Sequence, residues 1–343
     1  MTNPPAGGVT SARWGVRYGP AMPAPERRHP VAEVIRERAA GGSLPGARDD
    51  PHRVALVLEG GGMRGVVSAA MTAALERMEL TRCFDLVVGA SAGAINGAAL
   101  LAGAARRGAA AYCGPLASRS FVSPAKLLRG KPVIDVNRIL DLAAGLDAAG
   151  HERVVGSPTA LHCVAVDVES ADCVVLSGMR SERELWDALL ASSRMPWAGG
   201  EPVEIGGRRY LDGGMGSAIP VEQAIAAGAT HVLALQTRPH GVPRRSASRL
   251  GDRLIERHLR RLNPALVTLY RDRVACYERV VEDIARQTVE PGGAPYVLGI
   301  RPPAGTPCVS QLERRAPVLA AAAAGAERLV EHALGLHAAL RAA

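Results

Sequence analysis

Aromatic residues are scarce in this chain: Phe, Trp and Tyr make up 3% of its 343 residues. Proteins that bind single-stranded nucleic acid stack bases on aromatic side chains, so we expect no nucleic-acid partner. The core must instead be built from Ala, Val and Leu, which the 48% hydrophobic content allows. Lysine occurs only at Lys126 and Lys131, so arginine carries nearly all of the positive charge.

The six cysteines show no Cys-x-x-Cys spacing, and no zinc-ligand pattern is present, so we expect reduced thiols and no metal site. Residues 1–50 are rich in Pro, Gly and Arg and lack the apolar stretch of a signal peptide. We therefore expect them to form a mobile N-terminal segment of a cytoplasmic protein. Residues 86–105 carry no charge and have the length of a membrane span, but their Ala and Gly content favours a globular interior.

A serine between two glycines, in the motif Gly-Ala-Ser-Ala-Gly at 89–93, follows the apolar run 86–88. This pattern predicts a strand, a sharp turn at Ser91 and then a helix, with Gly89 and Gly93 where a Cβ atom would clash. The turn exposes the hydroxyl beside the N-terminus of the helix, where free amides favour a negatively charged oxygen. The motif therefore indicates a nucleophilic serine.

A glycine-rich loop lies upstream, where the apolar run 54–58 is followed by Gly60, Gly61, Gly62 and then Gly65. Amides at the start of a helix bind phosphate or the oxyanion of an acyl-transfer intermediate. A dinucleotide loop has the same glycine spacing, but it needs an acidic residue at the end of the next strand. Asp85 precedes that strand, so the nucleotide interpretation is disfavoured.

A third motif supplies a carboxylate: Asp212 ends the short run 208–212 and is followed by Gly213 and Gly214. Asp-Gly most often marks a turn. A serine hydroxyl is nevertheless a weak nucleophile until a base takes its proton, and that base must come from elsewhere in the chain.

The order of these three motifs resembles that of the patatin-like phospholipase family, and the resemblance covers residues 54–237. It implies a three-layer α/β/α fold with a mixed, mainly parallel sheet. It also implies a Ser91–Asp212 dyad with an oxyanion hole at Gly60, Gly61, Gly62, Met63 and Arg64. Two residues depart from the family's pattern, Glu59 before the glycines and Trp197 after Pro196. They leave the shape of the acyl pocket open.

Short apolar runs at 54–58, 86–88 and 232–235 alternate with helical stretches and predict parallel strands buried on both faces. The runs 163–168 and 173–176 are close enough to form a hairpin. We expect a catalytic core over residues 51–240, with a mobile rim at 119–139, and a helical region over 241–343 that packs on it.

Residues 238–273 hold ten arginines against three acidic residues, in a chain of net charge +8. A helix over 246–262 would carry Arg249, Arg253, Arg257 and Arg261 four residues apart. Such a helix either lies on an anionic membrane or is a solvated face with local ion pairs. Both interpretations stay open at this stage.

The function that the resemblance implies is hydrolysis of lipid carboxylic esters, which requires no metal or organic cofactor. Three alternatives stay open: a Ser-His-Asp triad with His240, a lipid-binding regulatory protein without turnover, and an acyltransferase that passes the acyl group to an alcohol. The sequence does not specify the head group, the acyl length or the oligomeric state.

Overall fold

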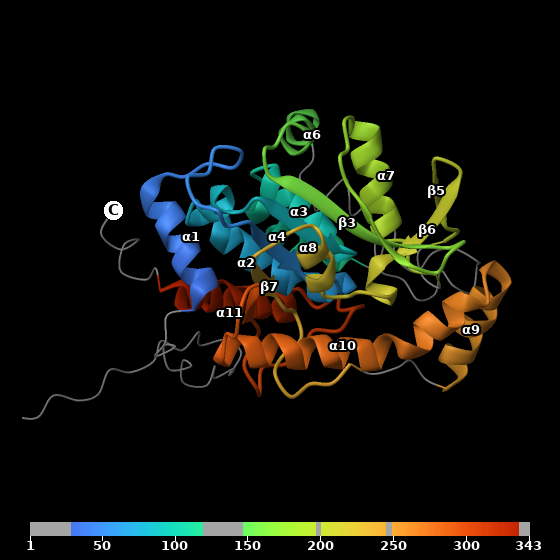
Figure 1. The fold of residues 1–343 in the computed structure, drawn as a ribbon. Coiled ribbons are helices and arrows are strands. Elements are labelled where there is room, and N and C mark those ends of the chain that lie inside the picture. The colour runs from blue at the N-terminus through green and yellow to red at the C-terminus, as the bar shows by residue number, and fades with distance from the viewer. Residues whose placement is uncertain (1–28, 119–146, 197–199, 245–248, 336–343) are drawn as a thin grey trace, which may run out of the picture.

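The computed structural model describes residues 29–118, 147–196, 200–244 and 249–335 (Figure 1). Residues 1–28 of the expected N-terminal segment lie outside these ranges. The expected rim at 119–139 and Trp197 lie outside them as well.

The centre of the fold is an eight-stranded sheet in which seven strands follow one path and β4 pairs with β3. Along the path the strands are β5 (Val203–Ile205), β6 (Arg208–Asp212), β3 (Ala160–Asp167), β2 (Leu86–Ala90), β1 (Val54–Leu58), β7 (His231–Leu235) and β8 (Tyr296–Ile300). The five strands from β3 to β8 are parallel. Strands β4 (Cys173–Leu176), β5 and β6 pair antiparallel, which confirms the predicted hairpin and the mixed sheet.

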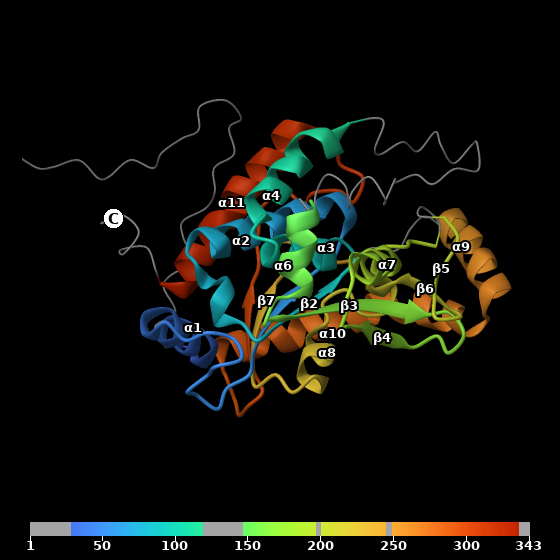
Figure 2. The same cartoon turned by 90° about the horizontal axis from the view of Figure 1, so that it is seen from above.

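Helices cover both faces of the sheet, as Figure 2 shows from above. One layer contains α2 (Val66–Arg77), α3 (Ala92–Leu101), α4 (Ala105–Cys113) and α11 (Ala316–Leu334), and the other contains α8 (Val221–Ala226) and α10 (Ala265–Val289). In β1, Leu56 and Leu58 pack into the first layer, whereas Ala55 and Val57 pack into the second. Because successive side chains of a strand point to opposite faces, an unbroken apolar run fits a sheet covered on both sides. The three-layer α/β/α prediction is confirmed.

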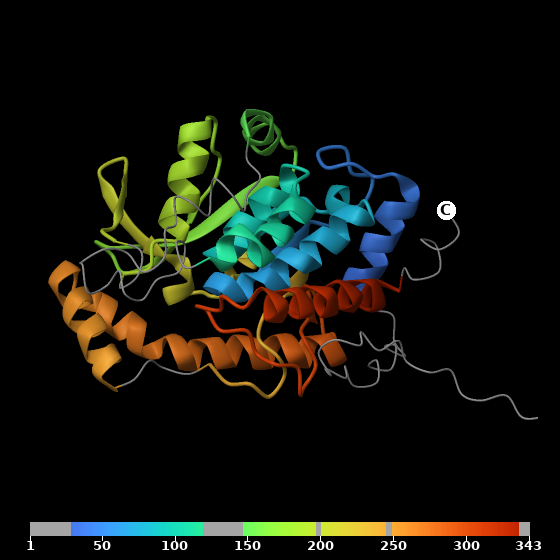
Figure 3. The ribbon, with the colours of Figure 1, turned by 180° about the vertical axis from the view of Figure 1, so that it is seen from behind.

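The remaining helices extend this core. Figure 3 shows α9 (Arg249–Leu262) at one end of the molecule, next to the end of α10. Helix α7 (Glu182–Ser192) packs on β3 and β6 at the same end, and α6 (Ala148–Val155) contacts α7. Ile255 and Leu259 of helix α9 belong to the same hydrophobic cluster as Met215, which directly follows the Asp-Gly-Gly motif.

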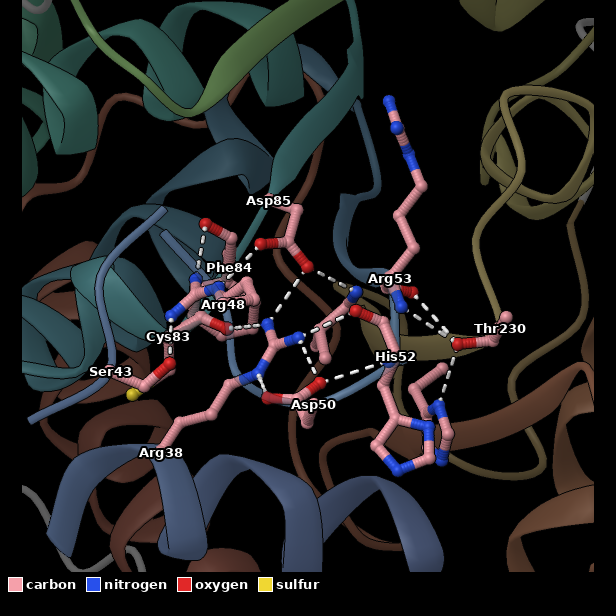
Figure 4. Close-up of polar contacts among 12 residues, drawn as sticks. Arg38, Ser43, Arg48, Asp50, His52, Arg53, Cys83, Phe84, Asp85 and Thr230 are labelled. Carbon is pink, nitrogen blue, oxygen red and sulfur yellow. Dashed lines mark hydrogen bonds and ion pairs between the residues drawn. The ribbon is translucent and has the colours of Figure 1, made fainter. Parts of the chain in front are cut away.

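The N-terminal boundary differs from the expected mobile segment, because residues 30–41 form helix α1 (Pro30–Gly41). Val31 and Ile35 of this helix have no exposed surface and belong to the main hydrophobic cluster. Arg38 is buried beside them and binds Asp50 and Asp85 (Figure 4). Residues 30–50 are therefore part of the folded domain. The composition of residues 1–50 predicted a mobile segment, but the apolar residues of α1 are spaced as in a helix that packs on the core.

The C-terminal region also differs from the expected all-helical one, since β8 adds a parallel strand to β7. The charge-free residues 86–105 form β2 and α3 with a sharp turn between them. Among the described residues, no helix combines the length and the apolar character needed to span a bilayer.

Candidate active site

Ser91 occupies the turn between β2 and α3 with a positive φ of 56° and a ψ of −129°. This conformation is costly for a residue with a Cβ atom, on the order of 1–3 kcal/mol, and persists only where the surroundings enforce it. Here the Ser91 amide donates to the carbonyl and to Oγ of Ser192, at 3.1 and 3.0 Å. The predicted sharp turn is confirmed, and it places the hydroxyl beside the N-terminus of α3.

Asp212 ends β6 and meets that hydroxyl. Ser91 Oγ donates to Asp212 Oδ2 at 2.8 Å, while the Gly214 amide donates to Oδ1 at 2.7 Å. Burial raises the pKa of Asp212 to about 6, even though both hydrogen bonds favour the ionised form. The site thus brings together a strained serine and a buried carboxylate of increased basicity, which are 121 residues apart in the sequence.

The glycine-rich loop lies against the end of β1, but only part of it offers free amides. The Gly60 amide donates to Ala218 O at 3.2 Å, and the Met63 amide donates to Gln311 O at 3.0 Å. The Arg64 amide donates to Gly61 O at 3.1 Å. Of the five loop positions expected at an oxyanion hole, these three have amides occupied by the fold.

The amides of Gly61 and Gly62 have no hydrogen-bond acceptor within the described residues, and both glycines line the pocket. Arg64 is buried and faces inward: its Nε donates to Thr237 Oγ1 at 3.1 Å, and its Nη2 lies 3.8 Å from Glu59 Oε1. Arg64 also lines the pocket, and its guanidinium links the glycine-rich loop to Thr237 and Glu59. Its expected place at the oxyanion hole stays a prediction.

Close packing explains the glycines of all three motifs. A Cβ atom on Gly93 would lie 2.2 Å from Leu58 O, and one on Gly213 would lie 2.1 Å from Val164 O. Any side chain there would push the turn or the Asp motif away from the sheet. A Cβ atom would also come within 3.0 Å of another atom at Gly60, Gly61, Gly62, Gly65, Gly89 and Gly214.

Ser91 and Asp212 share a pocket with side chains that the sequence did not single out. The pocket has a volume of about 50 Å³ and is partly open to the surface. The residues that the sequence analysis did not place at this site are Arg244, Arg273, Tyr277, Gln311, Met195 and Met215. Tyr277 does pack in the core as its helical spacing indicates, but its hydroxyl also donates to Glu59 Oε1 at 3.1 Å.

Glu59, the residue that departs from the family's pattern, also lines this pocket and connects three segments around it. Its side chain is buried and accepts from the Thr237 amide at 2.5 Å and from Tyr277. The glycine-rich loop, β7 and α10 are thereby tied together through one carboxylate.

Three arginines line the pocket, Arg64, Arg244 and Arg273, against the two carboxylates of Glu59 and Asp212. Arg244 donates through Nη2 to Gly214 O at 3.0 Å, and no carboxylate pairs with its guanidinium among the described residues. Burial, followed by the nearby charge of Arg273, lowers the pKa of Arg244 to about 10, so Arg244 stays charged at neutral pH. Arg273 pairs with Asp252 of α9 at 3.1 Å.

No histidine lines this pocket in the described part of the chain. His240 is exposed in the loop after β7, where its amide donates to Pro302 O. Within the same residues, no group of three His, Cys, Asp or Glu side chains could hold a metal ion. Asp212 is therefore the ionisable partner that the structure places on Ser91.

Two comparisons with known proteins match this chain. An uncharacterized protein of Escherichia coli (strain K12), YjjU, is 32% identical over 197 residues, which cover 55% of this chain and 53% of that protein. The chain thus spans about half the length of this curated relative. The family model described as patatin-like phospholipase matches residues 56–225, a range that contains Ser91 and Asp212. This family consists in general of lipid acyl hydrolases, and the chain belongs to it.

Proposed function

We propose that this protein is a serine hydrolase that cleaves carboxylic esters of lipids through an acyl-serine intermediate. The observation that carries the proposal is the 2.8 Å hydrogen bond from Ser91 Oγ to Asp212 Oδ2. A carboxylate with its pKa raised to about 6 is ionised at neutral pH and more basic than an ordinary aspartate.

The reaction follows from these positions. Asp212 takes the proton of Ser91 as Oγ attacks the ester carbonyl, and the Gly61 and Gly62 amides hold the developing oxyanion, assisted by the positive end of α3. The tetrahedral intermediate collapses, and the alcohol leaves with the proton from Asp212. Asp212 then deprotonates a water molecule that attacks the acyl-serine, and it returns this proton to Ser91 Oγ as the fatty acid is released.

The charge of the pocket favours lipids with an anionic group next to the ester. Arg244 and Arg273 both line the pocket, and Arg244 has no carboxylate partner in the described residues. A phosphate beside the scissile ester would supply that partner, because guanidinium groups bind phosphate with charge-assisted hydrogen bonds. We therefore infer a phosphate-bearing glycerolipid as the preferred substrate class.

A fluorophosphonate probe tests the nucleophile directly. We expect stoichiometric labelling of the intact protein, with the modified peptide containing Ser91, since phosphonates react with serines activated by a base and an oxyanion hole. The Ser91→Ala variant should stay unlabelled, whereas Ser193→Ala, a neighbouring buried serine, should label like the wild type.

The reaction products distinguish a hydrolase from an acyltransferase. A labelled enzyme that releases free fatty acid is a hydrolase, and one that releases acyl-alcohol from a mixture of lipid and alcohol is an acyltransferase. An unlabelled Ser91 in folded protein contradicts the proposal and supports the regulatory alternative.

The phosphate preference predicts a substrate-dependent effect of Arg244→Gln. A lost hydrogen bond to a charged group costs about 1.5–3 kcal/mol, so kcat/KM for an anionic phospholipid should fall at least tenfold. With a neutral ester of the same acyl chain it should change less than threefold. Initial rates of fatty-acid release on both substrates give the comparison.

Two matched variants accompany this measurement. Arg244→Lys keeps the positive charge and should recover part of the loss. Arg238→Gln serves as the control, because Arg238 also lies over the Tyr277 ring but does not line the pocket. An equal loss on both substrates would show that Arg244 only holds the loop at Gly214.

A further inference from the structure

Helix α9 presents one face on which arginines and leucines are mixed. Leu250 and Leu254 of this helix are 68% and 60% exposed. Their spacing from Arg257 and Arg261 follows the helical period, so these four side chains share one face. The opposite face carries Ile255 and Leu259, which are buried against the core.

The positive charge on this helix is not neutralised. Its two acidic residues turn toward α10: Asp252 accepts from Tyr270 and Arg273, and Glu256 pairs with Arg271 at 2.6 Å. Within the described residues, no carboxylate pairs with the helix's own arginines, which are Arg249, Arg253, Arg257, Arg260 and Arg261. The local ion pairs that a merely solvated face would need are therefore absent from it.

The exposed face also lies one layer away from the pocket. Met215 lines the pocket and belongs to the same hydrophobic cluster as Ile255 and Leu259 of α9. Arg273 lines the pocket too and is held by Asp252 of the same helix. A surface bound to α9 would thus lie beside the site that holds Ser91, at the end of the molecule shown in Figure 3.

We propose that α9 is an interfacial helix that binds the surface of an anionic lipid bilayer, with its arginines on the head groups and Leu250 and Leu254 in the acyl boundary. Amphipathic helices that combine basic residues with an exposed apolar strip lie in the plane of such surfaces. A nucleic-acid backbone would satisfy the arginines but would leave both leucines in water. The proposal does not depend on turnover at Ser91.

Vesicle sedimentation tests it, with every protein carrying Ser91→Ala so that lipid is not consumed. We expect binding to vesicles of phosphatidylglycerol and phosphatidylcholine, little binding to phosphatidylcholine alone, and weakening by high salt. Each arginine near an anionic surface is worth about a fivefold change in partitioning, so Arg253→Glu with Arg257→Glu should lower binding at least 50-fold at low salt.

The matched control reverses two exposed arginines outside α9, Arg106 and Arg180, which changes the net charge by the same amount. It should bind within threefold of the parent. Leu250→Ser with Leu254→Ser should lower binding at least fivefold without changing the charge. Circular dichroism and thermal unfolding of each variant confirm that the loss is not a folding defect.

Several results would overturn the proposal. Equal binding to neutral and anionic vesicles, or undiminished binding of the Arg253→Glu/Arg257→Glu protein, would show that the α9 arginines do not bind the head groups. Undiminished binding of the Leu250→Ser/Leu254→Ser protein would show that these leucines do not insert into the bilayer. Tighter binding to duplex DNA than to vesicles, lost in the same arginine variant, identifies nucleic acid as the partner. Hydrolysis of a soluble ester, measured separately with Ser91 intact, decides the proposed enzymatic function independently of these outcomes.

Discussion

Asp212→Asn should lower kcat/KM for ester hydrolysis by about 1,000-fold or more at pH 8. A positioned general base contributes 10²–10⁴-fold, and the amide of asparagine cannot take the proton of Ser91. The asparagine side chain keeps the shape of the carboxylate, and its oxygen can still accept from the Gly214 amide. The loss is therefore chemical rather than steric. Steady-state rates on a soluble acyl ester measure it, with intact lipid as the second substrate.

His240→Ala is the matched control for this prediction and should keep activity within threefold. His240 is exposed and does not line the pocket. The reverse pattern, with activity lost in His240→Ala and retained in Asp212→Asn, would exclude the dyad and favour a triad.

Because the pKa of Asp212 is raised, both the catalytic rate and the stability of the protein should depend on pH. Because the ionised carboxylate is the base, kcat/KM of the wild type should fall as the pH drops through about 6. Stability should respond in the opposite sense. An aspartate whose pKa is raised on folding stabilises the native state only while it is protonated, so its ionisation between about pH 4 and 6 destabilises the protein.

At pH 8 the Asp212→Asn protein should consequently have a free energy of unfolding in urea up to about 3 kcal/mol higher than the wild type. This gain in stability should shrink as the pH falls toward 4. A residue with only a structural role would show a loss of stability instead. This combination of lost activity and gained stability distinguishes a base held in a destabilising site from a packing residue.

The parts of the site that lie within one short segment were predictable from sequence. The turn at Ser91 needs small neighbours on both sides, and the contact of a Gly93 Cβ with Leu58 O gives the steric reason. The buried parallel strands were equally readable, because an apolar run without alternation fits only a sheet covered on both faces. The pairing of Ser91 with Asp212, by contrast, was predicted only through the family resemblance.

Contacts made by distant loops were not predictable. The Met63 amide is occupied by Gln311 O, which arrives from the segment between β8 and α11, and nothing near residue 63 indicates it. The arginines of residues 238–273 posed a similar problem. Composition shows their number, but only the fold turns Arg244 and Arg273 into the pocket and leaves the α9 arginines outside.

Arg38→Ala should destabilise the protein by about 3–5 kcal/mol, the largest stability effect that we expect from a single substitution. Arg38 is 2% exposed and binds Asp50 in a two-pronged contact at 2.8 and 2.9 Å, and Asp85 at 2.8 Å (Figure 4). It also donates to the carbonyls of Cys83 and His52. The substitution leaves two carboxylates and two carbonyls without this hydrogen-bond donor. Removing one partner of a buried ion pair is strongly destabilising because the other charge stays buried without compensation.

Urea unfolding at pH 7 measures this loss, with Arg36→Ala on the same helix as the control that should cost less than 1 kcal/mol. The effect should also depend on pH. Hydrogen bonds from Arg38 hold the pKa of Asp50 at about 2, so the stability from this pair is present above about pH 4 and is lost as the pH falls toward 2. A gap between wild type and Arg38→Ala that stays constant from pH 7 to pH 2 would mean that Arg38 stabilises α1 by packing alone. The helix would then be held by Val31 and Ile35 rather than by its link to Asp85, which also binds the Val54 amide at the start of β1.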